Sequence, residues 1–115
     1  MKTKQKYSIK SRIWICTDEG TYLGEGRIAL LKEIDKHGSI SKAAKAMKMS
    51  YKKAWELVNS MNQQGNSPLV ARKIGGTGGG GSELSEAGKK AIELFTTLNS
   101  TQRLYLDEQI AQVDF

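Results

Sequence analysis

Residues 39–62 read SISKAAKAMKMSYKKAWELVNSMN, a pattern that predicts two short helices joined by a tight corner. Ser41 precedes an Ala/Lys-rich run and Ser50 precedes a longer one, and a serine hydroxyl in front of a helix accepts a hydrogen bond from a free backbone N–H. Only residues 47–49 separate the two runs, too few for a flexible loop. The stretch therefore predicts a helix-turn-helix, the arrangement whose second helix enters the major groove of DNA.

Each of these two helices has one apolar face, because apolar residues recur at spacings of three and four. The residues are Ala43, Ala44 and Met47 in the first helix and Ala54, Leu57, Val58 and Met61 in the second. Two faces of such small size can pack closely. Lys48 occupies the corner, where glycine is common, so we expect Lys48 to adopt a positive φ at a cost of about 1 kcal/mol.

The exposed side chains of the second helix are candidates for contacting DNA. Lys52 and Lys53 lie in its first turn, where the helix dipole favours acids, so two adjacent lysines there indicate function rather than helix stability. We expect Ser50 and Tyr51 to donate to phosphate, and Asn59, two turns later, to reach a base or the backbone. For the tryptophan of this helix, at position 55, packing at the edge of the core is the favoured interpretation.

A hairpin is predicted directly after the second helix, over residues 69–84. Its two strands are residues 69–74 and 82–84, and a run rich in glycine joins them. A hairpin in this position is the wing of a winged helix, and we expect it to pair with the N-terminal strand in one small sheet. Its candidate DNA contacts are Arg72 and Lys73 at the base and Thr77 and Gly78 in the loop.

The glycine-rich run, residues 75–81, also invites a nucleotide-binding interpretation, because glycines let backbone N–H groups approach phosphate. A phosphate-binding loop needs Lys-Ser/Thr after its last glycine and then a helix. Here Ser82, Glu83 and Leu84 follow instead, as a strand. The sequence therefore favours a wing over a nucleotide site.

The remaining segments complete a single winged domain over residues 1–115. They are a basic tail at 1–6, a strand or hairpin at 7–23, a three-helix core at 27–64 with the recognition helix at about 50–64, and a C-terminal helix at 85–110. The glycine at position 38 is expected to end the first core helix, and Ser85 to cap the last one. The last helix has more apolar surface than a small domain needs, which favours a dimer interface over an ordinary core helix.

The charge of the chain is strongly uneven. Residues 1–82 have fifteen Lys/Arg and six Asp/Glu, a net +9, whereas residues 83–115 have three and six, a net −3. Localised positive charge suits nucleic acid, although it also serves solubility or binding to anionic membranes. No apolar run is long enough to span a membrane, the N-terminus lacks an apolar signal core, and the single Cys16 fits a reducing cytoplasm.

No set of catalytic or metal-binding residues emerges. His37 is the only histidine and precedes a helix-ending glycine, so a capping or surface role is expected. One histidine and one cysteine cannot build a zinc site. We therefore expect neither catalysis, nor a cofactor, nor a metal.

Several segments resemble the N-terminal DNA-binding domain of ModE-type molybdate-responsive transcriptional regulators. They are RIWI at 12–15, IDKHGSISKAA at 34–44, MSYKKAW at 49–55 and the glycine loop at 75–81, of which the piece SISKAA is also similar to LysR-type regulators. The resemblance implies a winged helix-turn-helix, dimerisation through terminal helices and promoter binding. In that family a separate C-terminal domain holds the oxyanion, and the chain ends at Phe115, so we expect no molybdate site here. Thr77 occupies a position where the family often has Lys or Arg, which implies that the wing binds phosphate less strongly.

The sequence thus predicts a mainly α protein with a small β-sheet that binds double-stranded DNA sequence-specifically, as a homodimer. Such a protein regulates transcription in the cytoplasm. The alternative is a winged helix that binds another protein and does not read DNA. The operator sequence, the direction of regulation and any small-molecule effector are left open.

Overall fold

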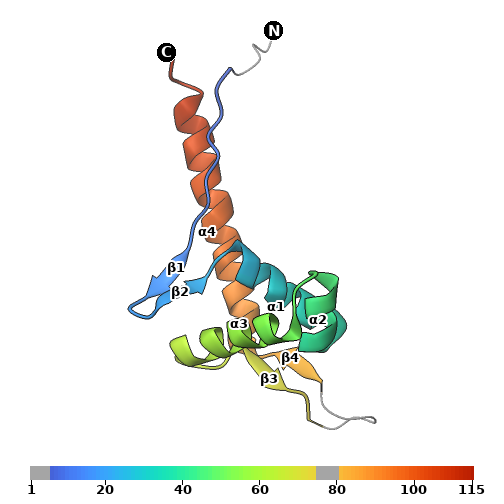
Figure 1. Ribbon diagram of the computed structural model, residues 1–115. Helices are drawn as coiled ribbons and strands as arrows, with labels where there is room; N and C mark the ends of the chain where they lie inside the picture. The colour runs from blue at the N-terminus through green and yellow to red at the C-terminus, as the bar shows by residue number, and fades with distance from the viewer. Residues whose placement is uncertain (1–5, 75–80) are drawn as a thin grey trace.

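A computed structural model describes residues 6–74 and 81–115, so Thr77 and Gly78 lie outside the described residues. Within these ranges, three helices and two short hairpins precede a long C-terminal helix. Figure 1 shows them gathered at one end of that helix. The elements are β1 (Ile15–Thr17), β2 (Gly20–Leu23), α1 (Glu25–His37), α2 (Ile40–Ala46), α3 (Tyr51–Gln64), β3 (Val70–Arg72), β4 (Ser82–Leu84) and α4 (Glu86–Ile110). This is the mainly α, winged helix-turn-helix fold that the sequence predicted.

The core lies where α1, α2 and α3 meet. Leu30, Leu31 and Ile34 of α1 are fully buried, and the small residues Ala43 of α2 and Ala54 of α3 are fully buried as well. Full burial of one such large aliphatic side chain stabilises the fold by about 1.5–3 kcal/mol. The predicted close packing of the two small helical faces is therefore confirmed, and α1 supplies most of the apolar volume against them.

Local sequence signals set most helix ends as predicted. The Ser50 hydroxyl accepts a hydrogen bond from the Lys53 amide at 3.0 Å, and Gly38 ends α1 with a φ of 73°. Lys48 has a φ of 56° at the corner between α2 and α3, as expected. The serine cap thus sets the start of α3, and Lys48 forms the corner between α2 and α3.

The predicted cap of α2 was wrong. Ser39, not Ser41, precedes the helix, and its hydroxyl accepts from the Lys42 amide at 3.0 Å. The left-handed turn at Gly38 allows the chain to restart a helix at once, and a start at Ile40 packs that side chain against the core. Ser41 is left exposed inside the first turn.

The expectation of one sheet that joins the N-terminal strand to the wing was also wrong. The strands form two separate antiparallel pairs, β1 with β2 and β3 with β4. The outer edge of β4 is met by the end of α1 instead, where the Ser82 amide donates to the Gly38 carbonyl at 2.9 Å. The helix end thus provides the partner that we had assigned to the N-terminal strand.

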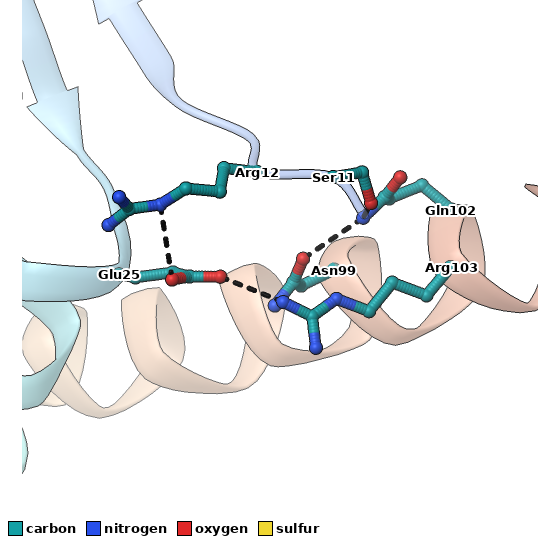
Figure 2. Close-up of polar contacts among 6 residues, drawn as sticks. All are labelled: Ser11, Arg12, Glu25, Asn99, Gln102 and Arg103. Atoms are coloured by element: carbon teal, nitrogen blue, oxygen red, sulfur yellow. Dashed lines mark hydrogen bonds and ion pairs between the residues drawn. The ribbon is translucent and has the colours of Figure 1, made fainter. Parts of the chain in front are cut away.

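The N-terminal segment before β1 runs along α4 (Figure 1). Gln102 donates from Nε2 to the Ser11 hydroxyl at 2.9 Å, and the Glu25 carboxylate lies between Arg12, at 3.4 Å, and Arg103, at 2.9 Å. Figure 2 shows these contacts joining three parts of the chain. Within the strand or hairpin predicted over residues 7–23, only Ile15–Thr17 and Gly20–Leu23 are strands, and residues before them support the outer half of α4.

Candidate nucleic-acid interface

Helix α3 presents a polar face opposite its buried one. Ala54, Val58 and Met61 are buried in the core, while Lys52 and Lys53 are exposed. No acidic residue lies in its first turn, so two positive charges stand at the positive end of the helix dipole. That placement costs helix stability, and an external anion would relieve it.

The wing lies beside α3, and a hollow separates the two. Its lining includes Tyr51, Trp55 and Asn59 from α3 and Arg72 and Ser82 from the wing. The structure therefore brings three of the predicted contact residues, Tyr51, Asn59 and Arg72, to one site. Ser50 and Lys52 lie on the same helix, and Lys73 follows Arg72, with its amide donating to the Gly81 carbonyl at 2.9 Å.

The position of the wing depends on Asn62, near the end of α3. Its Oδ1 accepts from the amides of Leu69 at 2.8 Å and Val70 at 3.1 Å, and its Nδ2 donates to the Val70 carbonyl at 2.9 Å. One side chain thus replaces a strand partner at the start of β3. The role of Asn62 was not predicted from the sequence, because an asparagine at the end of a helix is not a local signal for contact with a later strand.

The same C-terminal end of α3 is also held by the β1–β2 hairpin and α1. Arg27 of α1 donates from Nη1 to the Ser60 hydroxyl at 3.0 Å and to the Tyr22 carbonyl at 3.4 Å, and Gln64 donates to the Thr21 carbonyl at 2.8 Å. Burial lowers the pKa of the Arg27 guanidinium and raises the pKa of the Tyr22 phenol. Neither shift moves a charge near neutral pH, since a guanidinium stays protonated and the phenol stays neutral.

The whole net charge of the chain is carried by the segment that contains α2, α3 and β3. Residues 40–73 include seven Lys/Arg and one acid, a net charge of +6. The rest of the chain has eleven Lys/Arg (18 − 7) and eleven Asp/Glu (12 − 1), so its net charge is zero. The seven are Lys42, Lys45, Lys48, Lys52, Lys53, Arg72 and Lys73, and all are exposed. A polyanion would therefore be attracted to this face in preference to the others.

Two further residues of α3 belong to this surface. Trp55 is 48% exposed and lines the hollow, so about half of the residue is covered and the rest lies open on the outer face of α3. Glu56 is exposed one turn after Lys52 and Lys53, as its position two residues from both Ala54 and Val58 predicts.

Other kinds of site find little support in the described part of the chain. Within it, no three His, Cys, Asp or Glu side chains gather as ligands for a metal ion. No helix there is both long and apolar enough to cross a bilayer. The geometry points to the basic face of α3 and the wing as the candidate site.

A two-helix corner, an exposed second helix and a hairpin held beside it define a winged helix-turn-helix protein. Residues 26–89 match the model of a family described as bacterial regulatory helix-turn-helix protein, lysR family, and the chain belongs to that family. The match begins in α1 and ends in the first turn of α4, so it covers the whole candidate interface.

Individual relatives agree with this family. The chain is 39% identical to the molybdenum transport protein ModE of Azotobacter vinelandii, over 84% of this chain and 36% of that protein. It is 46% identical to the transcriptional regulator ModE of Yersinia pestis and to the DNA-binding transcriptional dual regulator ModE of Escherichia coli K12, over 70% of this chain and 31% of each relative. The resemblance to ModE regulators is thus confirmed, and the chain spans about a third of these relatives.

A solved structure shares the fold at lower similarity. ArgP from Mycobacterium tuberculosis superposes with a TM-score of 0.51 and 20% sequence identity, covering 72% of this chain and 29% of that one. At this identity the likeness concerns the arrangement of helices and wing alone.

Proposed function

We propose that this chain is the DNA-reading module of a bacterial transcription regulator, which binds duplex DNA through α3 and the wing. The observation that carries the proposal is the concentration of the entire net charge, +6, in residues 40–73, the segment that contains α2, α3 and β3. The family and the ModE relatives, whose names describe transcriptional regulators, support the same role. A DNA-reading role also implies the cytoplasm as its location.

Each contact residue has a role that its position suggests. The first turn of α3 approaches the major groove, with Lys52 and Lys53 neutralising phosphates and Ser50 and Tyr51 donating to them. Asn59 faces the base edges, since an asparagine recognises adenine through two hydrogen bonds. Arg72 and Lys73, at the base of the wing, contact the neighbouring backbone. Thr77 and Gly78 are proposed to continue this contact along the glycine loop.

The module is proposed to act as a homodimer through α4. The stripe of Leu94, Leu98 and Tyr105 recurs every four and seven residues along one side of the helix, and these side chains are 54%, 43% and 60% exposed. The N-terminal segment contacts α4 at Gln102, beside this stripe, and the exposed side chains of the stripe offer apolar surface to a second copy. A symmetric pair would present two recognition helices to two half-sites, about 34 Å apart on one side of the duplex.

The test is a fluorescence titration of labelled duplex DNA at salt concentrations between about 50 and 200 mM. Each phosphate contact adds about 0.9 to the slope of log affinity against log salt, so six contacts give a slope near −5. An affinity that does not change over this range would refute binding through the basic face. No affinity even at the lowest salt, with co-purification of a protein partner, would favour the alternative role as an interaction module.

A further inference from the structure

Glu56 is an exception on the proposed DNA-binding face. It is the one acid in residues 40–73, a segment with seven basic residues. Helix geometry turns it away from the core, because it lies two residues from buried Ala54 and two from buried Val58, about 200° around the axis from each. Its carboxylate therefore points in the direction from which DNA would approach α3.

The carboxylate of Glu56 is unpaired in the described part of the chain. Lys53 and Lys52 stand three and four residues earlier, the spacings at which ion pairs form on a helix, yet neither pairs with it there. Glu25, Glu33 and Glu86 do have basic partners. A local helix-stabilising role for Glu56 is therefore not what the structure supports.

The surroundings of Glu56 also provide acceptors and amides in place of cations. A second hollow on this face is lined by Glu19, Glu56, Asn59, Ser60, Gln63 and Gln64, with no basic residue among them. Gln63 donates from Nε2 to the Asn59 Oδ1 at 3.4 Å, so the two amides are aligned along the same face. Glu56 thus begins a row of hydrogen-bonding side chains that leads away from the lysines.

A free carboxylate facing DNA is repelled by the phosphates. It can be bound favourably only where a base edge donates a hydrogen bond to it. In the major groove, cytosine offers its N4 amino group, whereas guanine offers two acceptors and thymine an acceptor and a methyl group. Adenine offers its N6 donor only beside the N7 acceptor, which repels a carboxylate. We propose that Glu56 determines specificity by accepting a hydrogen bond from the N4 amino group of a cytosine in each half-site. This inference rests on the proposed DNA-binding function.

The experiment selects binding sites from a pool of duplexes with a randomised central segment, at one fixed salt concentration. The full chain, Glu56→Ala and Glu56→Gln are compared with Glu93→Ala, a matched control that removes an exposed acid from α4. The unaltered chain and the control should enrich the same motif, with a cytosine at a fixed place in each half-site. Glu56→Ala should enrich the same motif without that preference, and Glu56→Gln should admit adenine there, since glutamine recognises adenine.

Replacement of that C·G pair by T·A in the selected duplex should lower the affinity of the unaltered chain by about 5- to 150-fold. This is the range expected for one base-edge contact. The same replacement should lower the affinity of the Glu56→Ala variant by less than about twofold. If Glu56→Ala keeps the full preference at every cytosine of the motif, the inference is wrong while the DNA-binding function stands. If the unaltered chain enriches no motif, sequence-specific binding itself is refuted, and this inference with it.

Discussion

Replacement of Asn62 by alanine is expected to destabilise the fold without removing any DNA-contacting group. The substitution removes all three hydrogen bonds between this side chain and the start of β3. Leu69 and Val70 are only 2% and 5% exposed, so their amides have little access to replacement water. A typical hydrogen bond contributes about 0.5–1.5 kcal/mol and an unsatisfied buried group costs about 1–3 kcal/mol. The free energy of unfolding should fall by about 2–4 kcal/mol.

The assay is urea unfolding followed by circular dichroism, at one protein concentration, because any association would make stability depend on concentration. Asn59→Ala is the matched control, since it removes the same side chain from the same helix three residues earlier. Asn59 makes one weak contact, with Gln63 at 3.4 Å, so its loss should change stability by less than about 0.5 kcal/mol. A loss below about 1 kcal/mol for Asn62→Ala, or an equal loss for both variants, would refute the structural role of Asn62.

Three further variants test separate parts of the fold. Gly88→Ala should destabilise the fold by about 1–3 kcal/mol in thermal unfolding, because the added Cβ would lie 2.3 Å from the Leu69 carbonyl oxygen. Alanine itself favours a helix, so a gain in stability would contradict that contact. Lys48→Gly should raise the free energy of unfolding by about 1 kcal/mol by relieving the φ of 56°, and an unchanged value would show that the corner is not strained. Leu98→Asp should halve the mass in light scattering by charging the exposed stripe of α4, and an unchanged dimer would exclude this side of the helix as the interface.

The sequence was sufficient for the elements whose causes are local. The cap at Ser50, the left-handed Gly38 and the strained Lys48 depend on residues within four positions, and the helix-turn-helix follows from them. The apolar surplus of the last helix was also visible in the residue spacing. The order of the helices and the wing could therefore be predicted without any structure.

Contacts between distant residues were the part that could not be predicted. The Ser82 amide reaches the Gly38 carbonyl across 44 positions, 82 − 38, and Arg103 reaches Glu25 across 78. Such pairs satisfy hydrogen-bonding groups that become neighbours only after the core has formed, so a strand pattern at the N-terminus does not reveal its partner. For the same reason the sequence indicated Lys52 and Lys53 as candidates but missed Asn62, which positions the wing beside them.

The central claim, that the first turn of α3 binds DNA, is tested most directly by two double variants. Lys52→Ala/Lys53→Ala and Lys89→Ala/Lys90→Ala each remove two adjacent exposed lysines near the start of a helix, so both lower the net charge by two. The slope of log affinity against log salt should fall by about two for the first variant, because each lysine accounts for about one phosphate contact, and should stay unchanged for the second. Equal slopes and equal affinities for the two variants would contradict the assignment of α3 as the DNA-binding helix.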